Sequence, residues 1–264
     1  MIYHYIRNNM GDDDMPYEKG GRADKYGNRF EARWIVYQLL DVLEEKKESI
    51  IIEPIGEDEE GVDILVEFNG HKEGQQCKGR NAGKEYWDFS SIKGKGILKK
   101  WKFQLDREEN YYVSLVSPLP FTFLEDLIKR ANTNDEDPHN FYNHQILNSS
   151  KKFVDFFKSF CKEMSISIPN ELNKSISYLK RIKFIQVPDT TLKELILSRI
   201  EYLFIGNSEE IYDSLISWIV EDEMLGKTID ITVFQNFLKR KRGRLTPLLF
   251  CLIFRTILLY KSQG

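Results

Sequence analysis

A β-hairpin centred on Asn69-Gly70 is the sequence feature that most constrains the fold. Strand-like runs cover residues 62–68 and 71–78 on either side of this dipeptide. Asn-Gly is typical of a two-residue type I′ turn, because both residues tolerate the positive φ that each turn position requires. Such a turn fixes which residues of the two strands lie opposite each other.

The register of this hairpin is predicted to gather three polar side chains. It places Asp63 opposite Gln76, and Lys78 shares the face of Gln76 because side chains alternate along a strand, with Cys77 on the other face. A carboxylate, an amide oxygen and an ammonium group in one place suit a hard divalent cation and an activated water. Asp and Lys on neighbouring strands also form exposed ion pairs without chemistry, so the hairpin alone is compatible with either interpretation.

Charge is unevenly distributed around the hairpin. The formal net charge is −3, but residues 41–67 hold eleven acidic and two basic side chains, whereas residues 72–107 hold ten basic and four acidic ones. An acidic segment beside a basic one could bind metal on one side and phosphate on the other, although solvated faces have the same composition.

The remaining composition excludes several classes of protein. The three cysteines are widely spaced, which disfavours a disulfide framework and a structural zinc site. The first fifteen residues have no apolar core of a signal peptide. The most apolar stretch, residues 245–260, contains Arg255 and is shorter than a bilayer span, so a buried helix and a cytoplasmic protein are expected.

Patterns in the first half predict a mixed α/β sheet flanked by helices. Apolar spacing predicts a helix over residues 25–47, on which Glu31 and Gln38 lie two turns apart on one side. The other expected elements are a strand at 49–53, the hairpin, a helix at 97–106, a strand at 111–117 and a helix at 122–131.

A polar stretch near residue 135 is the best candidate for a domain boundary. We therefore expect a loose lead-in over residues 1–24, an α/β domain over 25–135 and a mostly helical linker or oligomerisation region over 136–264. The second region is predicted to contain helices at 151–164, 170–177, 190–203, 209–223, 231–240 and 245–260, with a short strand at 182–187.

The ordered combination of these residues resembles the PD-(D/E)XK nuclease superfamily over roughly residues 25–117. The motifs are Glu31 on the first helix, Asp63 on a strand and Gln76-Cys77-Lys78 on the next strand. Together with Gly27-Asn28-Arg29-Phe30-Glu31, Tyr37-Gln38 and the later Trp101…Gln104-Leu105, they look like the double-stranded DNA endonuclease domain of bacterial antiphage effectors, found in CBASS systems and in STAND-type antiviral NTPases.

This resemblance implies a restriction-endonuclease-like fold and a catalytic role for each motif residue. Asp63 would be the central metal ligand, joined by Glu31, the Gln76 amide oxygen and the Cys77 backbone carbonyl. Lys78 would orient the attacking water or neutralise charge on the phosphate. Mg²⁺ is the expected metal, with Mn²⁺ possible, and Gln38 would support its bound waters or pack the helix. Gln76 departs from the acidic residue usual at its position and leaves the site less negative.

The same resemblance implies partners. Double-stranded DNA is the expected substrate, with Arg80, Lys84, Lys93, Lys95 and Lys99 as candidate DNA contacts. Cutting both strands with one site favours a homo-oligomer. The chain has no GxxxxGK[ST] phosphate loop, so a sensor or NTPase module is expected on another chain or on a missing C-terminal part. A catalytically silent nucleic-acid-binding or assembly module and an RNA-directed nuclease are the alternatives.

Overall fold

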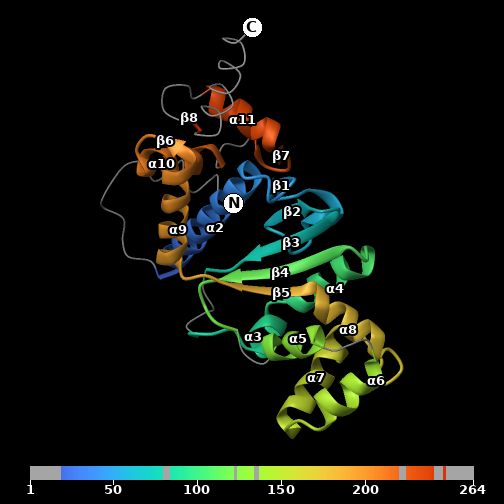
Figure 1. Ribbon diagram of the computed structural model, residues 1–264. Helices are drawn as coiled ribbons and strands as arrows, with labels where there is room; N and C mark the ends of the chain where they lie inside the picture. The colour runs from blue at the N-terminus through green and yellow to red at the C-terminus, as the bar shows by residue number, and fades with distance from the viewer. Residues whose placement is uncertain are drawn as a thin grey trace. The chain divides into compact units, whose positions relative to one another are not determined.

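The computed structural model describes residues 19–79, 84–121, 124–133, 137–219, 224–240 and 246–247 (Figure 1). Three predictions fall wholly or largely outside these residues. They are the lead-in before residue 19, the DNA contact of Arg80 and the helix over 245–260.

Helices account for most of the described residues. They are α2 (Lys19–Leu43), the 3-10 helix η1 (Gly56–Glu59), α3 (Phe89–Gly94), α4 (Ile97–Arg107), α5 (Leu124–Asn132), α6 (Pro138–Asn140), the π-helix η2 (Phe141–Leu147), α7 (Lys151–Glu163), α8 (Leu172–Arg181), α9 (Asp189–Leu203), α10 (Ser208–Ile219) and α11 (Ile231–Arg240). In the part of the chain described here, none of them is both long enough and apolar enough to span a membrane.

Six strands form one mixed sheet in the order β5-β4-β3-β2-β1-β7. Two further strands, β6 and β8, form a separate antiparallel pair. The strands are β1 (Ser49–Ile52), β2 (Ile64–Phe68), β3 (His71–Cys77), β4 (Tyr111–Ser117), β5 (Ile182–Gln186), β6 (Phe204–Ile205), β7 (Thr228–Asp230) and β8 (Thr246–Pro247). The predicted mixed α/β sheet flanked by helices is therefore confirmed.

The predicted hairpin turn is present. Asn69 and Gly70 have φ values of 49° and 71°, so both central residues adopt the positive φ of a type I′ turn. Strand β2 begins at Ile64, two residues later than predicted. The reason is local: Gly61 has a φ of 74°, and the N–H of Val62 donates to the Glu59 carbonyl instead of joining the sheet.

The chain divides into two compact units. Unit 2 consists of Glu53–Leu65 and Gly70–Pro188. It contains β3, β4 and β5, which are parallel to one another, with Gln76 paired to Leu115 and Leu115 to Phe184. Helices α4 and α8 both contact β4, and the indole of Trp101 on α4 is buried 5.8 Å from the Phe184 ring.

Unit 1 consists of Met1–Ile52, Val66–Asn69 and Asp189–Gly264. Helices α2, α9 and α10 pack against one another, as Figure 1 shows, and β7 pairs with β1 in antiparallel fashion. Leu39, Ile196 and Leu215 are completely buried in the core between them. Arginines tie the helices together: Arg33 lies 2.7 Å from Asp189, and Arg199 lies 2.8 Å from Asp41.

These two units do not follow the boundary expected at residue 135. Strand β5 comes from beyond it and pairs with β4, and β7 comes from beyond it and pairs with β1. The difference has a physical origin, because strand pairing across more than 60 residues leaves no mark in local composition, which was the only basis for the predicted boundary.

Candidate functional site

Asp63 is held at the start of β2 by its backbone. Its N–H donates to the Gln75 carbonyl at 2.9 Å, and its carbonyl accepts the N–H of Glu53 at 2.9 Å. The first bond is to the residue before the predicted partner Gln76. With both backbone groups bonded to flanking segments, the position of the carboxylate depends on few remaining torsions.

The Asp63 carboxylate contacts two groups of the Cys77-Lys78 segment. Its Oδ2 accepts the Cys77 backbone N–H at 2.7 Å and lies 3.5 Å from the Lys78 ammonium. The side chains are 25% and 32% exposed, so both can reach a molecule outside the protein. The Lys78 N–H in turn donates to the Val116 carbonyl at 2.9 Å, which fixes Lys78 to β4.

Gln76 is buried, and its side-chain oxygen has no hydrogen-bond partner among the described residues. Paired residues of neighbouring strands share a face, so Gln76 lies on the same face as Leu115 and Phe184, which α4 covers through Trp101. A buried acceptor without a partner costs about 1–3 kcal/mol. Such an oxygen calls for a water or a cation as its partner.

Gln76, Glu31 and Gln38 are the other side chains predicted to bind or support the metal. No described contact joins Gln76 to Asp63. Glu31 and Gln38 lie on α2 in unit 1, where Glu31 is half-buried and Gln38 is buried, its side-chain oxygen also without a partner among the described residues. Their roles toward Asp63 stay predictions.

The residues of unit 2 fit a hard cation in kind. The carboxylate of Asp63, the free amide oxygen of Gln76 and the Cys77 carbonyl are all oxygen donors of the type that Mg²⁺ accepts. Within the described ranges no group of three or more His, Cys, Asp or Glu side chains is arranged to hold a metal. A site at Asp63 would therefore depend on amide and carbonyl oxygens and on bound water.

Two of the candidate DNA contacts are already paired inside the protein. Lys84 lies 2.7 Å from the carboxylate of Asp88, the N-cap of α3. Its hydrogen bond, with that of Ser91, holds the pKa of Asp88 well below its usual range. Lys93 lies 2.6 Å from Glu163. The sequence could not reveal the Lys93 pair, because its partner is 70 residues away.

Lys95 and Lys99 are exposed as well. Lys95 lies 5.8 Å from the centre of the buried Trp87 ring. Lys99 lines a surface hollow of about 790 Å³. The full lining of this hollow is Gly56, Glu57, Glu59, Glu60, Gly61, Lys99, Lys100 and Phe103.

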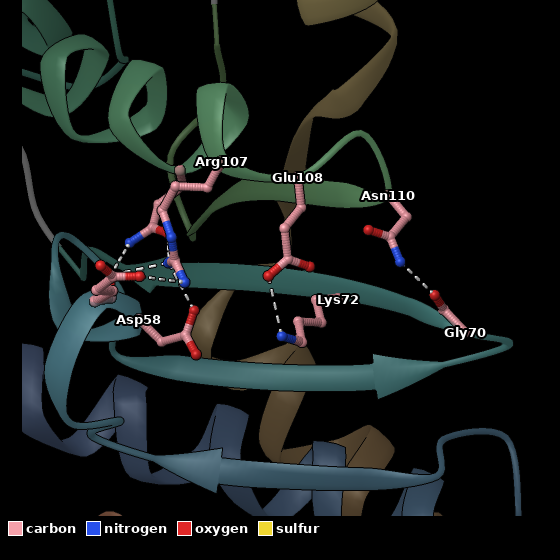
Figure 2. Close-up of polar contacts among 8 residues, drawn as sticks. Asp58, Gly70, Lys72, Arg107, Glu108 and Asn110 are labelled. Carbon is pink, nitrogen blue, oxygen red and sulfur yellow. Dashed lines mark hydrogen bonds and ion pairs between the residues drawn. The ribbon is translucent and has the colours of Figure 1, made fainter.

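A polar clamp that the sequence did not reveal holds one wall of this hollow. Gln104 and Arg107 of α4 bond the backbone of η1, and Arg107 also pairs with Asp58 at 2.9 Å (Figure 2). Further along the same side of the hairpin, Lys72 pairs with Glu108 at 3.2 Å. The periodicity of α4 marks Gln104 only as a polar residue on an otherwise apolar face.

A second buried polar cluster crosses three strands. The Glu73 carboxylate accepts from Gln75 at 2.8 Å and from Ser114 at 2.6 Å, and lies 2.5 Å from the Lys183 ammonium. Burial alone would raise the pKa of Glu73, but Lys183 and these hydrogen bonds hold it below its ordinary value. Alternation along β3 places this cluster on the face opposite Gln76, so it is separate from the Asp63 site.

Comparisons with known proteins identify a shared fold. Neither models of protein families nor curated proteins give a match. Among solved structures, the Cap4 SAVED/CARF-domain containing receptor of Acinetobacter baumannii, with the cyclic trinucleotide 2'3'3'-cAAA, has a TM-score of 0.50 and 16% identity, and the match covers 80% of this chain and 44% of that one. The corresponding receptor of Moraxella osloensis has a TM-score of 0.47 and 13% identity, covering 80% and 46%. The chain thus shares the fold of part of the first receptor and spans less than half of its length.

Proposed function

We propose that the chain is a metal-dependent endonuclease that hydrolyses double-stranded DNA as an effector in antiphage defence. The observation that carries the proposal is the Asp63 carboxylate, held by the Cys77 N–H at 2.7 Å with the Lys78 ammonium 3.5 Å away. The residue motifs supply the reaction class and the defence role. The fold shared with a receptor that contains a cyclic trinucleotide is compatible with an effector attached to a signal sensor.

In this proposal some residues hold the metal ion, and Lys78 stabilises the charge that develops on the phosphate. Asp63 would hold Mg²⁺ together with the Cys77 carbonyl, with Gln76 and Glu31 as further oxygen donors. Bound there, the ion would polarise the scissile phosphate and lower the pKa of a coordinated water. Lys78 keeps its ammonium at the edge of the site, where it would donate to a phosphate oxygen and stabilise the negative charge that develops during attack.

The proposal is tested by plasmid nicking with purified protein and Mg²⁺. We expect Lys78→Ala and Asp63→Asn each to lower the cutting rate by about 10²–10³-fold, the usual loss for a group that stabilises a transition state. Circular dichroism should show that both variants keep the fold, because the ion pair is partly exposed and contributes at most about 1 kcal/mol.

Lys72→Ala is the matched control. Lys72 lies on β3, which ends just before Lys78; it is also 32% exposed and pairs with Glu108 at 3.2 Å, but it is at the far end of the hairpin. It should cut at the wild-type rate. Cutting that persisted in both Lys78→Ala and Asp63→Asn would disprove the nuclease proposal. A parallel reaction with single-stranded RNA decides the substrate.

A second candidate function is recognition of a cyclic oligonucleotide. It is favoured by the cyclic trinucleotide in the Acinetobacter baumannii receptor, part of which shares the fold of this chain. Calorimetric titration with 2'3'3'-cAAA tests it. If the chain bound the cyclic trinucleotide tightly and left DNA intact, this second function would replace the nuclease proposal. DNA cutting without binding of the trinucleotide would support the nuclease proposal.

A further inference from the structure

The side chain of Gln104 is completely buried and fully bonded. Its amide nitrogen donates to the Glu57 carbonyl at 2.9 Å and to the Glu60 carbonyl at 3.2 Å. Its oxygen accepts from Arg107 at 2.6 Å, and the same arginine nitrogen donates to the Glu57 carbonyl at 3.0 Å. Gln104 thereby holds η1 at Glu57 and the residue that follows η1 at Glu60.

This grip is close to Asp63 along the chain. Two residues separate Glu60 from Asp63, and both are constrained. Gly61 has a φ of 74°, and a Cβ there would lie 2.7 Å from the Cβ of Lys100, so α4 approaches the backbone directly. The Val62 N–H donates to the Glu59 carbonyl at 3.2 Å. Because both residues are constrained, a shift of the loop is expected to be transmitted to the Asp63 backbone.

We propose that Gln104 is a positioning residue for the Asp63 site. By fixing the loop from Glu57 to Gly61 it sets where β2 begins, and so where the Asp63 carboxylate meets the Cys77 N–H. Arg107 assists by orienting the Gln104 amide. The expected effect of Gln104 on DNA cutting rests on the proposed nuclease function. Its expected effect on the geometry of the site does not.

The other end of the hairpin offers a matched comparison. Asn110, just before β4, donates its side-chain amide to the Gly70 carbonyl at 2.7 Å, as Figure 2 shows. This bond has the same chemistry as that of Gln104 but holds the turn instead of the Asp63 end. If loss of any amide clamp simply loosened the hairpin, the two residues would be equivalent.

The test measures amide hydrogen exchange by NMR in Gln104→Met, which keeps the length of the side chain but removes its hydrogen bonds. The Cys77 N–H is the reporter, because it donates to Asp63 Oδ2. The Lys78 N–H, bonded to the Val116 carbonyl at 2.9 Å, is the internal reference for overall stability. We expect Cys77 to exchange about tenfold faster relative to Lys78, equivalent to about 1.4 kcal/mol of local opening. Asn110→Leu should leave this ratio unchanged.

The second readout is the cutting reaction. Gln104→Met should lower kcat by about 10²-fold with KM unchanged, because a misplacement of about 1 Å has effects of this size. A wild-type protein that does not cut would contradict the proposed function and leave the exchange readout decisive for Gln104.

An unchanged Cys77-to-Lys78 ratio in a folded Gln104→Met variant would overturn the positioning role. Should that variant not fold, Arg107→Gln takes its place. It removes the bonds to the Glu57 carbonyl and to Gln104 while leaving the buried amide intact. A smaller rise of the same ratio is expected there, and no rise would overturn the inference.

Discussion

At the scale of single residues, an uncommon feature of the Asp63 site is a buried hydrogen-bond acceptor without a donor. Gln76 is 6% exposed, and its oxygen finds no partner among the described residues. Its neighbour Gln75 is also buried, but its side-chain amide donates to Glu73 at 2.8 Å. A carboxylate introduced at position 75 would therefore lie beside the carboxylate of Glu73, whereas one at position 76 would not, and this difference can be measured.

Replacing Gln76 by Glu should make stability depend on divalent metal. Without metal, the buried carboxylate should cost about 1–3 kcal/mol of unfolding free energy. With millimolar Mn²⁺, a cation shared with Asp63 should restore most of this loss, which thermal unfolding with and without metal would show.

Gln75→Glu is the control for this prediction. Its carboxylate would face that of Glu73, so the loss should persist in Mn²⁺. Equal recovery of both variants, or recovery of neither, would contradict a cation at Gln76.

At the scale of elements, local sequence patterns predicted most helices and strands, because most of these elements are long enough to show a periodicity. The strand at Tyr111–Ser117 and the helix at Ile231–Arg240 lie where they were expected. Strand β7 has three residues, too few for a periodicity to be recognised. The π-helix η2 also leaves no recognisable pattern in the sequence.

The same reasoning explains what could be foreseen of the site. The contact between Asp63 and Lys78 follows from one hairpin turn, so it depends on residues close in sequence. The clamp of Gln104 on Glu57 spans 47 residues and ends on a backbone carbonyl. No side-chain pattern in the loop marks that carbonyl as an acceptor, because Gln104 reaches it only once α4 has packed against the loop.

The Glu73 and Lys183 pair links β3 to β5 and predicts a pH-dependent stability. Because Lys183 lowers the pKa of Glu73, the pair contributes stability above the unfolded pKa of about 4.3 and loses it as the pH falls through the folded value. In Lys183→Met, burial should instead raise the pKa of Glu73, so this variant loses stability as the pH rises above about 4.

The expected loss in Lys183→Met is therefore largest at neutral pH. It should be about 2–3 kcal/mol at pH 7, less than for a fully buried pair because Lys183 is 39% exposed, and should shrink near pH 4. Urea unfolding at the two pH values measures it. Lys72→Met, which opens a more exposed pair with Glu108, should lose under 1 kcal/mol. A loss for Lys183→Met that is equal at both pH values would show that Glu73 does not carry it.

At the scale of the whole molecule, the second half completes the structures that the first half begins. In unit 2, β4 pairs with β5 and contacts α8, both from beyond residue 135. In unit 1, α2 packs on α9 and α10, also from beyond it. The helical region predicted as a separate linker is thus part of both hydrophobic cores.

A fragment of residues 1–135 should consequently fail to fold. It would leave β4 without its β5 partner and expose Leu115, which is completely buried, while α2 would lose the helices that cover Leu39. The lost burial of several such side chains, at roughly 1.5–3 kcal/mol each, is comparable to the total stability of a typical domain. We expect no cooperative thermal transition and a collapsed ¹H–¹⁵N spectrum, whereas a fragment of residues 19–240, which keeps all six strands of the sheet, should unfold cooperatively. A cooperative transition in the shorter fragment would mean that the first half is a folding unit by itself, and that the pairing of β4 with β5 is dispensable for holding Asp63 and Lys78 together.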